Sequence, residues 1–272
     1  MNITTFFNEN HKITHGLIFM IVFLICLNLE YLFGVSDKKV KFKNIRTNLM
    51  FILPGFVFQN ILGLVFVKVL IWENLNHFGL LSYFNMHSTT QQLMISFIVL
   101  DFFYWLYHFL MHKYSVVWRF HAVHHSDKVL NVSTSLREHP VETTIRLSHY
   151  MLITWLLGPM VWLISLHQFV QILSKIIIHS NWRLPDNIDK YLSYLILTPN
   201  MHHVHHHEKQ PYTDSNFGDL FSIWDRAFGT FQFLPKEKVI FGLDVEIFKE
   251  NPQTLRFKEL IKLPFGKQKL NN

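Results

Sequence analysis

The sequence predicts an all-α fold: a multi-pass bundle of transmembrane helices with a cytosolic cap rich in histidine. Half of the 272 residues are hydrophobic and only 16% are charged, against about 25% in a typical soluble domain. Long apolar runs recur along the chain, and 27 phenylalanines exclude disorder. The single cysteine, Cys26, excludes a disulfide scaffold and a thiolate zinc finger.

The first two spans are expected from Gly16 to Phe33 and from Leu49 to Trp72. The first run is near the minimum length for a bilayer crossing. We do not expect it to be a signal peptide, because the residues before it are nearly uncharged and no small-residue cleavage site follows. We therefore expect both runs to remain in the protein as membrane helices.

Charge between the spans predicts the topology. Lys38–Arg46 carries five cations, whereas Glu73–Gln92 contains no Lys or Arg. The positive-inside rule then places Lys38–Arg46 in the cytoplasm and the amino terminus outside. A third span, from Leu93 to about Met111, returns the chain to the cytoplasm. Basic loops also explain the net charge of +6 without a nucleic-acid partner.

A fourth apolar stretch runs from Glu142 to about Ile178, with Gly158 and Pro159 near its middle. This pattern predicts a helical hairpin that enters from the cytoplasm and returns to it. Each arm reaches about 26 Å, barely enough to cross a bilayer, so both a re-entrant hairpin and two full spans remain open. We predict N-terminal membrane helices over residues 1–92, a catalytic domain over 93–234 and a cytosolic tail over 235–272.

Histidines are the most unusual feature of the composition, because the chain has 18 of them. Fourteen lie between His108 and His207, and they form one HxxxH and two HxxHH groups. On a helix, positions i, i+3 and i+4 share one face, so each group directs several imidazoles to one place. Such ligands suit Fe, Zn, Cu or Ni rather than Mg or Ca. The groups comprise eight residues: His108, His112, His121, His124, His125, His202, His205 and His206.

All of these groups fall on the predicted cytoplasmic side, although the topology rests on Lys and Arg alone. Eight imidazoles are too many for one ion, and both two six-coordinate ions and two tetrahedral zincs would be consistent with that number. His139 and His179 are two further candidate ligands. We expect ordinary core or surface positions for the remaining histidines, which are His11, His15, His77, His87, His149, His167, His203 and His207.

These motifs resemble those of the integral-membrane fatty acid hydroxylase and sterol desaturase superfamily. The resemblance covers about residues 40 to 265 and is densest from 101 to 230. It is carried by six segments: Asp101–His108, Trp118–Ser126, Arg137–Glu142, His179–Asn181, Thr198–Gly218 and Trp224–Phe231. His203 stands where the family more often has Arg, and a shifted third group (His203, His206, His207) would also read HxxHH. We take His202, His205 and His206, because Thr198 and Pro199 precede them as in the family.

The resemblance implies two irons that activate O₂ and hydroxylate a C–H bond of a lipid, such as a fatty acyl chain or a sterol. Side chains that accept from the second ring nitrogen should orient the ligands. Asp101 is the main candidate, since it lies two turns before His108 and a carboxylate inside a span is expensive. Glu142, Asp214 and Asn216 are weaker candidates, because capping and turn formation also explain them.

The predicted function is a membrane diiron monooxygenase, with a desaturase on the same site as the closest alternative. A metal transporter would place its ligands near the bilayer midplane, whereas these histidines lie at the predicted cytoplasmic ends of the helices, which argues against that function. A zinc hydrolase would need H-E-x-x-H, and His108–His112 lacks the glutamate. With no G-x-G-x-x-G motif and no haem or flavin domain, we expect electrons from a separate reductase, ferredoxin or cytochrome. The expected location is a bacterial inner membrane or the endoplasmic reticulum, with the catalytic face in the cytoplasm.

Overall fold

A computed structural model describes residues 11–33, 38–86, 88–244 and 256–266. Within these residues the chain is helical and has no strand, with two isolated bridges, Ile196 to Phe221 and His207 to Phe241. The predicted all-α fold is therefore confirmed. The helices are α2 (His11–Phe33), α3 (Lys38–Leu49), α4 (Ile52–Asn76), α5 (Leu80–Tyr83), α6 (Thr89–Lys113), α7 (Ser115–His125), η1 (Val132–Leu136), α8 (Pro140–Leu157), α9 (Val161–Ile178), α10 (Asp186–Leu192), α11 (Pro199–His205), α12 (Ile223–Ala227), η2 (Lys236–Lys238), α14 (Phe257–Lys262) and η3 (Leu263–Phe265).

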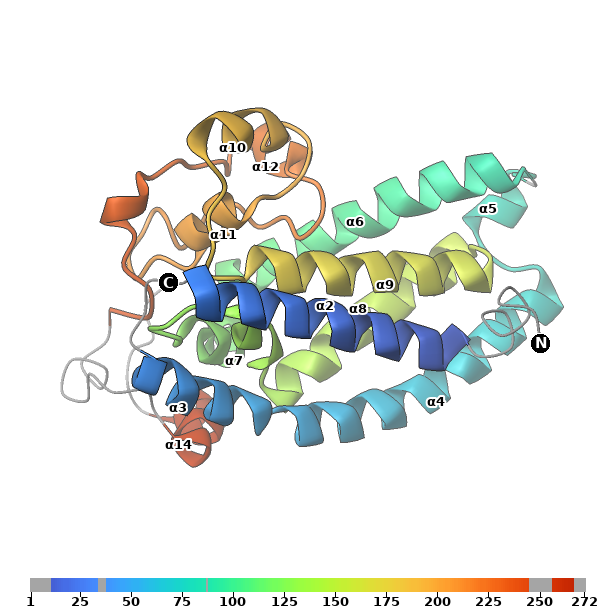
Figure 1. Ribbon diagram of the computed structural model, residues 1–272. Helices are drawn as coiled ribbons and strands as arrows, with labels where there is room; N and C mark the ends of the chain where they lie inside the picture. Colours follow the sequence, from blue (N-terminus) through green and yellow to red (C-terminus); the bar gives the residue numbers. More distant parts are fainter. Residues whose placement is uncertain (1–10, 34–37, 87, 245–255, 267–272) are drawn as a thin grey trace, which may run out of the picture.

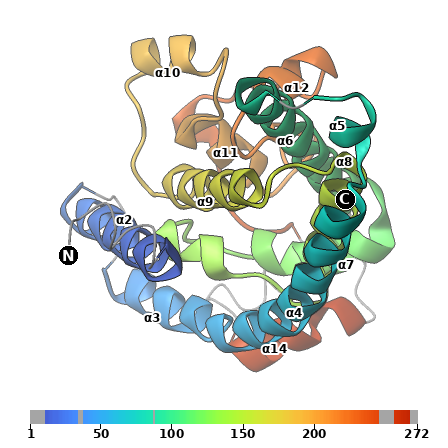
Figure 2. The same cartoon turned by 90° about the vertical axis from the view of Figure 1, so that its right-hand side faces the viewer.

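Five long helices, α2, α4, α6, α8 and α9, run side by side and form the bundle (Figure 1). Helix α8 packs against α4 and α6, and α9 packs against α2 and α6. The core between them contains Leu100, Tyr150, Leu157 and Ile164. Viewed along the bundle from the end that holds α5, α9 lies between α2 and α6 (Figure 2).

Three helical stretches are long and apolar enough to cross a membrane: Lys41–Glu73, Thr89–Lys113 and Val161–Ile178. The first stretch has an exposed apolar surface, because only 6% of its most apolar 18-residue segment is buried in the protein. Such an exposed apolar surface is typical of a helix that faces lipid. The predicted first span corresponds to a shorter apolar helix, Ile18–Leu32.

The predicted hairpin is present as α8 and α9, joined at Gly158. Gly158 has a φ of 71°, and a Cβ there would lie 2.6 Å from the carbonyl oxygen of Phe78. Gly79 has a φ of 122°, and a Cβ on it would lie 2.5 Å from Gly158 Cα. Two glycines thus allow the turn of the hairpin to pack directly on the loop after α4.

The remaining helices, apart from α5, form a cap at the end of the bundle where α6 and α9 finish (Figure 1). Trp118, Ala122 and Val123 of α7 pack against Leu260 and Leu263 near the C-terminus. In the predicted tail, residues 245–255 and 267–272 lie outside the described residues. The described part of the tail therefore packs against α7, the helix that carries the second histidine motif, His121–His125.

Candidate metal centre

Nine buried histidines form two adjacent groups in the cap. In each group the candidate ligand atoms lie within 4.8 Å of one another. The first group has five members and the second has four. The first consists of His108, His112, His121, His125 and His205, and the second of His124, His179, His202 and His206.

Helix geometry divides each HxxHH motif between the two groups. In α7, His121 and His125 are one turn apart and belong to the first group, whereas His124 belongs to the second. The third motif is divided the other way, because its one-turn pair, His202 and His206, lies in the second group. Neighbouring residues in each motif, such as His124 and His125, therefore belong to different groups. The two groups are in contact, because the rings of His125 and His206 stack with centroids 4.5 Å apart.

Local signals fix where these helices begin and end. The Thr198 hydroxyl accepts from Met201 N at the start of α11, and Pro199 occupies its first turn. These are strong helix-start signals, so they fix the register of the histidines that follow. His179 is the C-cap of α9, and its Nδ1 lies 2.7 Å from the Lys175 carbonyl oxygen.

A fixed acceptor faces Nδ1 in six of the nine rings. Two acceptors are carboxylates: Glu142 lies 2.6 Å from His121 Nδ1, and Asp214 lies 3.2 Å from His112 Nδ1. Four are backbone carbonyls: Phe217 at His108, Arg137 at His124, Lys175 at His179 and Ser215 at His205. A neutral imidazole whose Nδ1–H donates in this way has a bare lone pair on Nε2.

Bare lone pairs meet in both groups. Nε2 of His108 lies 3.0 Å from Nε2 of His121, and Nε2 of His124 lies 3.0 Å from Nε2 of His179. Two unprotonated nitrogens at this distance repel each other unless a cation lies beside both. His125 is also fully buried, and neither of its ring nitrogens has a hydrogen-bond partner among the described residues. The donor set therefore fits a metal ion in each group.

The nitrogen spacing also fits metal binding. Two imidazole nitrogens that bind one ion lie about 3 Å apart, because each is about 2.1 Å from it. In the second group, successive Nε2 atoms along His124, His179, His202 and His206 are 3.0, 3.0 and 3.1 Å apart. These four rings are therefore close enough together to bind one ion.

Burial keeps the rings in the form that binds metal. Burial, and then the neighbouring imidazoles, lower the pKa of His124, His125, His205 and His206 well below 6.5. Metal ligation requires the neutral ring. The chain therefore presents uncharged ligands at neutral pH without prior deprotonation.

Of the four predicted orienting residues, the structure places two against ring nitrogens, namely Glu142 and Asp214. Asp101 instead accepts from Gln171 at 3.0 Å and Trp224 at 2.8 Å. It thus ties α6 to α9 and α12, and Phe217 takes the expected place at His108. Asn216 likewise bonds backbone groups of Met201 and Gln232.

His139, predicted as a further ligand, lies in neither group. Its Nδ1 accepts from Val141 N at the start of α8, and its Nε2 lies 3.3 Å from the Ile261 carbonyl oxygen. Because both nitrogens have protein partners, we leave His139 out of the proposed ligand set. His203 faces the Ser180 carbonyl oxygen, and His207 Nδ1 accepts from Lys209 N. Of the other histidines, His87 lies outside the described residues.

A buried polar network next to the second group was not predicted from the sequence. The Arg137 guanidinium donates to Asn48 and Ser126, pairs with Asp127 at 3.4 Å, and so ties α3 to the chain after α7. Its own carbonyl oxygen faces His124. The Arg-x-His-Pro element marks this position in the sequence, but its contact with α3 needs the folded chain.

The central part of the chain is similar in sequence to a known protein family. The sequence model of the fatty acid hydroxylase family matches residues 93–230, about half of the chain. The chain belongs to the fatty acid hydroxylase family. The matched segment contains all nine histidines of the two groups.

Several curated relatives of this fatty acid hydroxylase family member act on lipids by name. Human alkylglycerol monooxygenase is 29% identical over 78% of this chain and 44% of its own length. Ornithine lipid hydroxylase OlsE of Rhizobium tropici is 28% identical over 53% of this chain and 43% of its own. Human lathosterol oxidase is 29% identical over 48% and 41%. The chain thus spans less than half the length of these relatives, and no solved structure matches it.

Proposed function

We propose that the chain is a membrane-bound diiron monooxygenase that hydroxylates a C–H bond of a lipid, using O₂ and electrons from a separate donor. The observation that carries this proposal is the pair of adjacent neutral imidazole groups at the end of lipid-facing helices. The names of the relatives, a monooxygenase and a lipid hydroxylase among them, support the same reaction class.

The nine histidines would hold the two irons, five at one and four at the other. Bound iron would supply activation of O₂, chemistry that protein side chains lack. The protein groups orient the rings through Nδ1 and exclude water. Trp118 and Phe217 pack on His112, with ring centroids 4.7 and 5.1 Å away.

The proposed orientation puts the histidine cap in the cytoplasm. The basic helix α3 lies at the cap end, where Asn44 donates to Asp127 just after α7. The loop without Lys or Arg lies around α5, at the opposite end of the bundle (Figure 1). The positive-inside rule then assigns the cap to the cytoplasm, where soluble electron donors are accessible.

Metal content and oxygen uptake test this function together. The purified chain should contain two irons and consume O₂ when it is reduced chemically. Stoichiometric zinc without iron, with no O₂ uptake, would contradict the proposal.

Total lipids from cells that express the intact chain should then be compared by mass spectrometry with lipids from cells that express His205→Ala. A hydroxylase adds one oxygen atom to its product, whereas a desaturase removes two hydrogens. Identical lipid profiles would count against a lipid substrate.

A further inference from the structure

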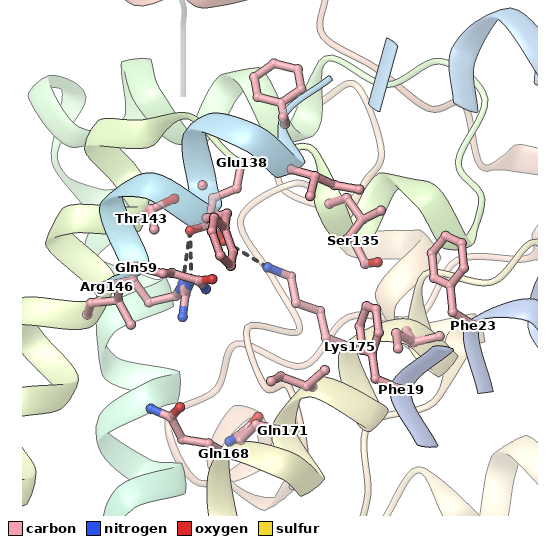
Figure 3. A pocket seen from close by; sticks show the side chains of 18 of the residues that line it. Phe19, Phe23, Gln59, Ser135, Glu138, Thr143, Arg146, Gln168, Gln171 and Lys175 are labelled. Atoms are coloured by element: carbon pink, nitrogen blue, oxygen red, sulfur yellow. Dashed lines mark hydrogen bonds and ion pairs between the residues drawn. The ribbon is translucent and has the colours of Figure 1, made fainter. Parts of the chain in front are cut away.

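A cavity of about 430 Å³ lies between α2, α4, α8 and α9 (Figure 3). Its size is typical of small-molecule sites. Most of its wall is apolar, and none of the nine grouped histidines lines it. It therefore adjoins the imidazole groups without containing them, since Lys175 lines it and contacts His179.

A partly buried ion cluster occupies one part of this cavity (Figure 3). Arg146 donates from Nε and Nη2 to Glu138 Oε1, at 3.1 and 3.0 Å, and Lys175 Nζ lies 3.1 Å from Glu138 Oε2. Both carboxylate oxygens are thus engaged, and the charged residues that line the cavity are two cations and one anion. The carboxylate of Asp219, outside the lining, also acts on both cations but forms no ion pair with them in the described chain. The positive charge of the lining is therefore only partly compensated, which favours an anionic ligand.

The cavity opens sideways toward the lipid-facing surface. Met20 of α2 and Ile52 and Phe56 of α4 line it, yet they are also exposed on the outer surface, with exposed fractions of 55%, 48% and 60%, respectively. Exposed apolar residues at a cavity mouth, on helices apolar enough for a membrane, indicate entry from the bilayer rather than from water.

The cluster lies at the histidine end of the cavity. The Lys175 carbonyl oxygen faces His179, and Glu142, one turn before Arg146, bonds His121. Tyr150, one turn after Arg146, and Gln168, two turns before Lys175, line the part that is farther along the helices. A lipid of the nearer leaflet has the same order, with its polar head at the membrane surface and its chain inward.

We propose that Arg146 and Lys175 bind the acidic headgroup, phosphate or carboxylate, of the lipid substrate, and that its chain lies between α2 and α4. This proposal rests on the proposed lipid oxidation and names the substrate class. Gln171 lines the same cavity, and its buried Oε1 has no hydrogen-bond partner in the described chain. It offers an acceptor to a hydroxyl or amide of the ligand.

Binding to the metal-free full chain in neutral detergent tests this without turnover. The probes are palmitate, palmitoyl lysophosphatidate and the uncharged palmitoyl glycerol, each competing with a fluorescent fatty acid. We expect the acidic probes to bind at least about tenfold more tightly than the neutral one, since hydrogen bonds to charged groups are the stronger kind. The tighter acidic probe would identify the group as carboxylate or phosphate. Equal binding of neutral and acidic probes overturns the proposal.

Two sets of variants locate the site. Lys175→Met should weaken the acidic probes about tenfold and spare the neutral probe, whereas Lys175→Arg should bind like wild type. Equal loss for all probes in Lys175→Met, or none, overturns the headgroup assignment.

Gly55 lines the cavity mouth, and a Cβ on Gly55 or on Gly63 of the same helix would meet no atom within 4 Å. Gly55→Phe should therefore weaken every probe, and Gly63→Phe should weaken none. Unchanged binding in Gly55→Phe overturns the chain position. A protein that passes these tests but lacks iron and O₂ uptake would keep this lipid site and lose the proposed function.

Discussion

At the scale of single residues, the two nitrogens of an imidazole have separate tasks in this protein. Nδ1 is held by an oxygen acceptor in six of the nine rings, and Nε2 of those rings is left for a metal. The acceptor fixes both the tautomer and the rotation of the ring. A histidine is thus a useful ligand only if its other nitrogen is also placed, which is where His203 and His205 differ.

Replacement of His205 by alanine should remove at least one iron per chain, because this ring offers Nε2 to the first group. His203→Ala is the matched control. It is a buried histidine of the same helix, α11, with Nε2 2.9 Å from the Ser180 carbonyl oxygen. Elemental analysis of the two purified variants measures the difference. Equal iron content would show that the two positions are equivalent and that the assigned register is wrong.

Glu142→Gln should lower metal affinity or activity by about 10- to 100-fold, the usual effect of losing such a partner. The Glu142 side chain is only 5% exposed and lies 2.6 Å from His121 Nδ1. Asp214→Asn should have a smaller effect, because its side chain is 31% exposed and its bond to His112 is 3.2 Å long. Iron release to a chelator compares them, and a larger effect in Asp214→Asn would contradict this ranking.

At the scale of helices, the spacing of the histidines was informative but incomplete. Positions i and i+4 predicted that the rings of each motif share a face, and the structure places all three motifs on helical segments. The spacing did not predict that His124 and His205 cross to the other group, since this depends on how α6, α7 and α11 pack. Asp101 illustrates the same limit, because helical periodicity placed it near His108 but its partners lie on α9 and α12.

Gly158→Ala should destabilise the fold by about 1–3 kcal/mol, because a left-handed residue with a Cβ is strained and this Cβ would collide with the chain after α4. Gly63→Ala provides the control, since its Cβ would meet no atom within 4 Å. Thermal unfolding in detergent measures both. If the two variants melt together, the contact between Gly79 and Gly158 does not hold the hairpin.

At the scale of the whole molecule, the apolar bundle was easier to predict from the sequence than the groups that orient the histidines. The composition and the charge of the loops predicted the bundle, because lipid-facing helices need little more than length and apolarity. The orienting layer was harder to predict, since four of its six acceptors are backbone carbonyls that have no signature in the sequence. Side-chain acceptors, by contrast, could be proposed from sequence, and two of the four candidates contact a ring.

The buried rings should make the metal-free protein sensitive to acid. Burial and neighbouring imidazoles depress the pKa of His125, His205 and His206 in the folded chain, whereas unfolded histidines titrate near 6.5. Below that value the unfolded chain binds more protons than the folded chain. The free energy of unfolding therefore decreases as the pH is lowered, by at most about 1.4 kcal/mol per pH unit for each such ring. Melting midpoints at about pH 7.5 and about pH 5.5 test this. A variant with alanine at 125 and 205 should show a weaker dependence, and a midpoint that does not fall with pH would refute it.

The backbone carbonyls that face the rings also determine which genetic changes the site tolerates. A substitution at Phe217, Ser215 or Lys175 changes the side chain and leaves the main-chain oxygen in place. Deletion of a single residue between 206 and 217 would shift the oxygens of Ser215 and Phe217 relative to the rings they orient. Apart from His206, Asp214, Asn216 and Phe217, whose side chains have roles of their own, this segment should therefore vary in residue type during evolution while it keeps its length.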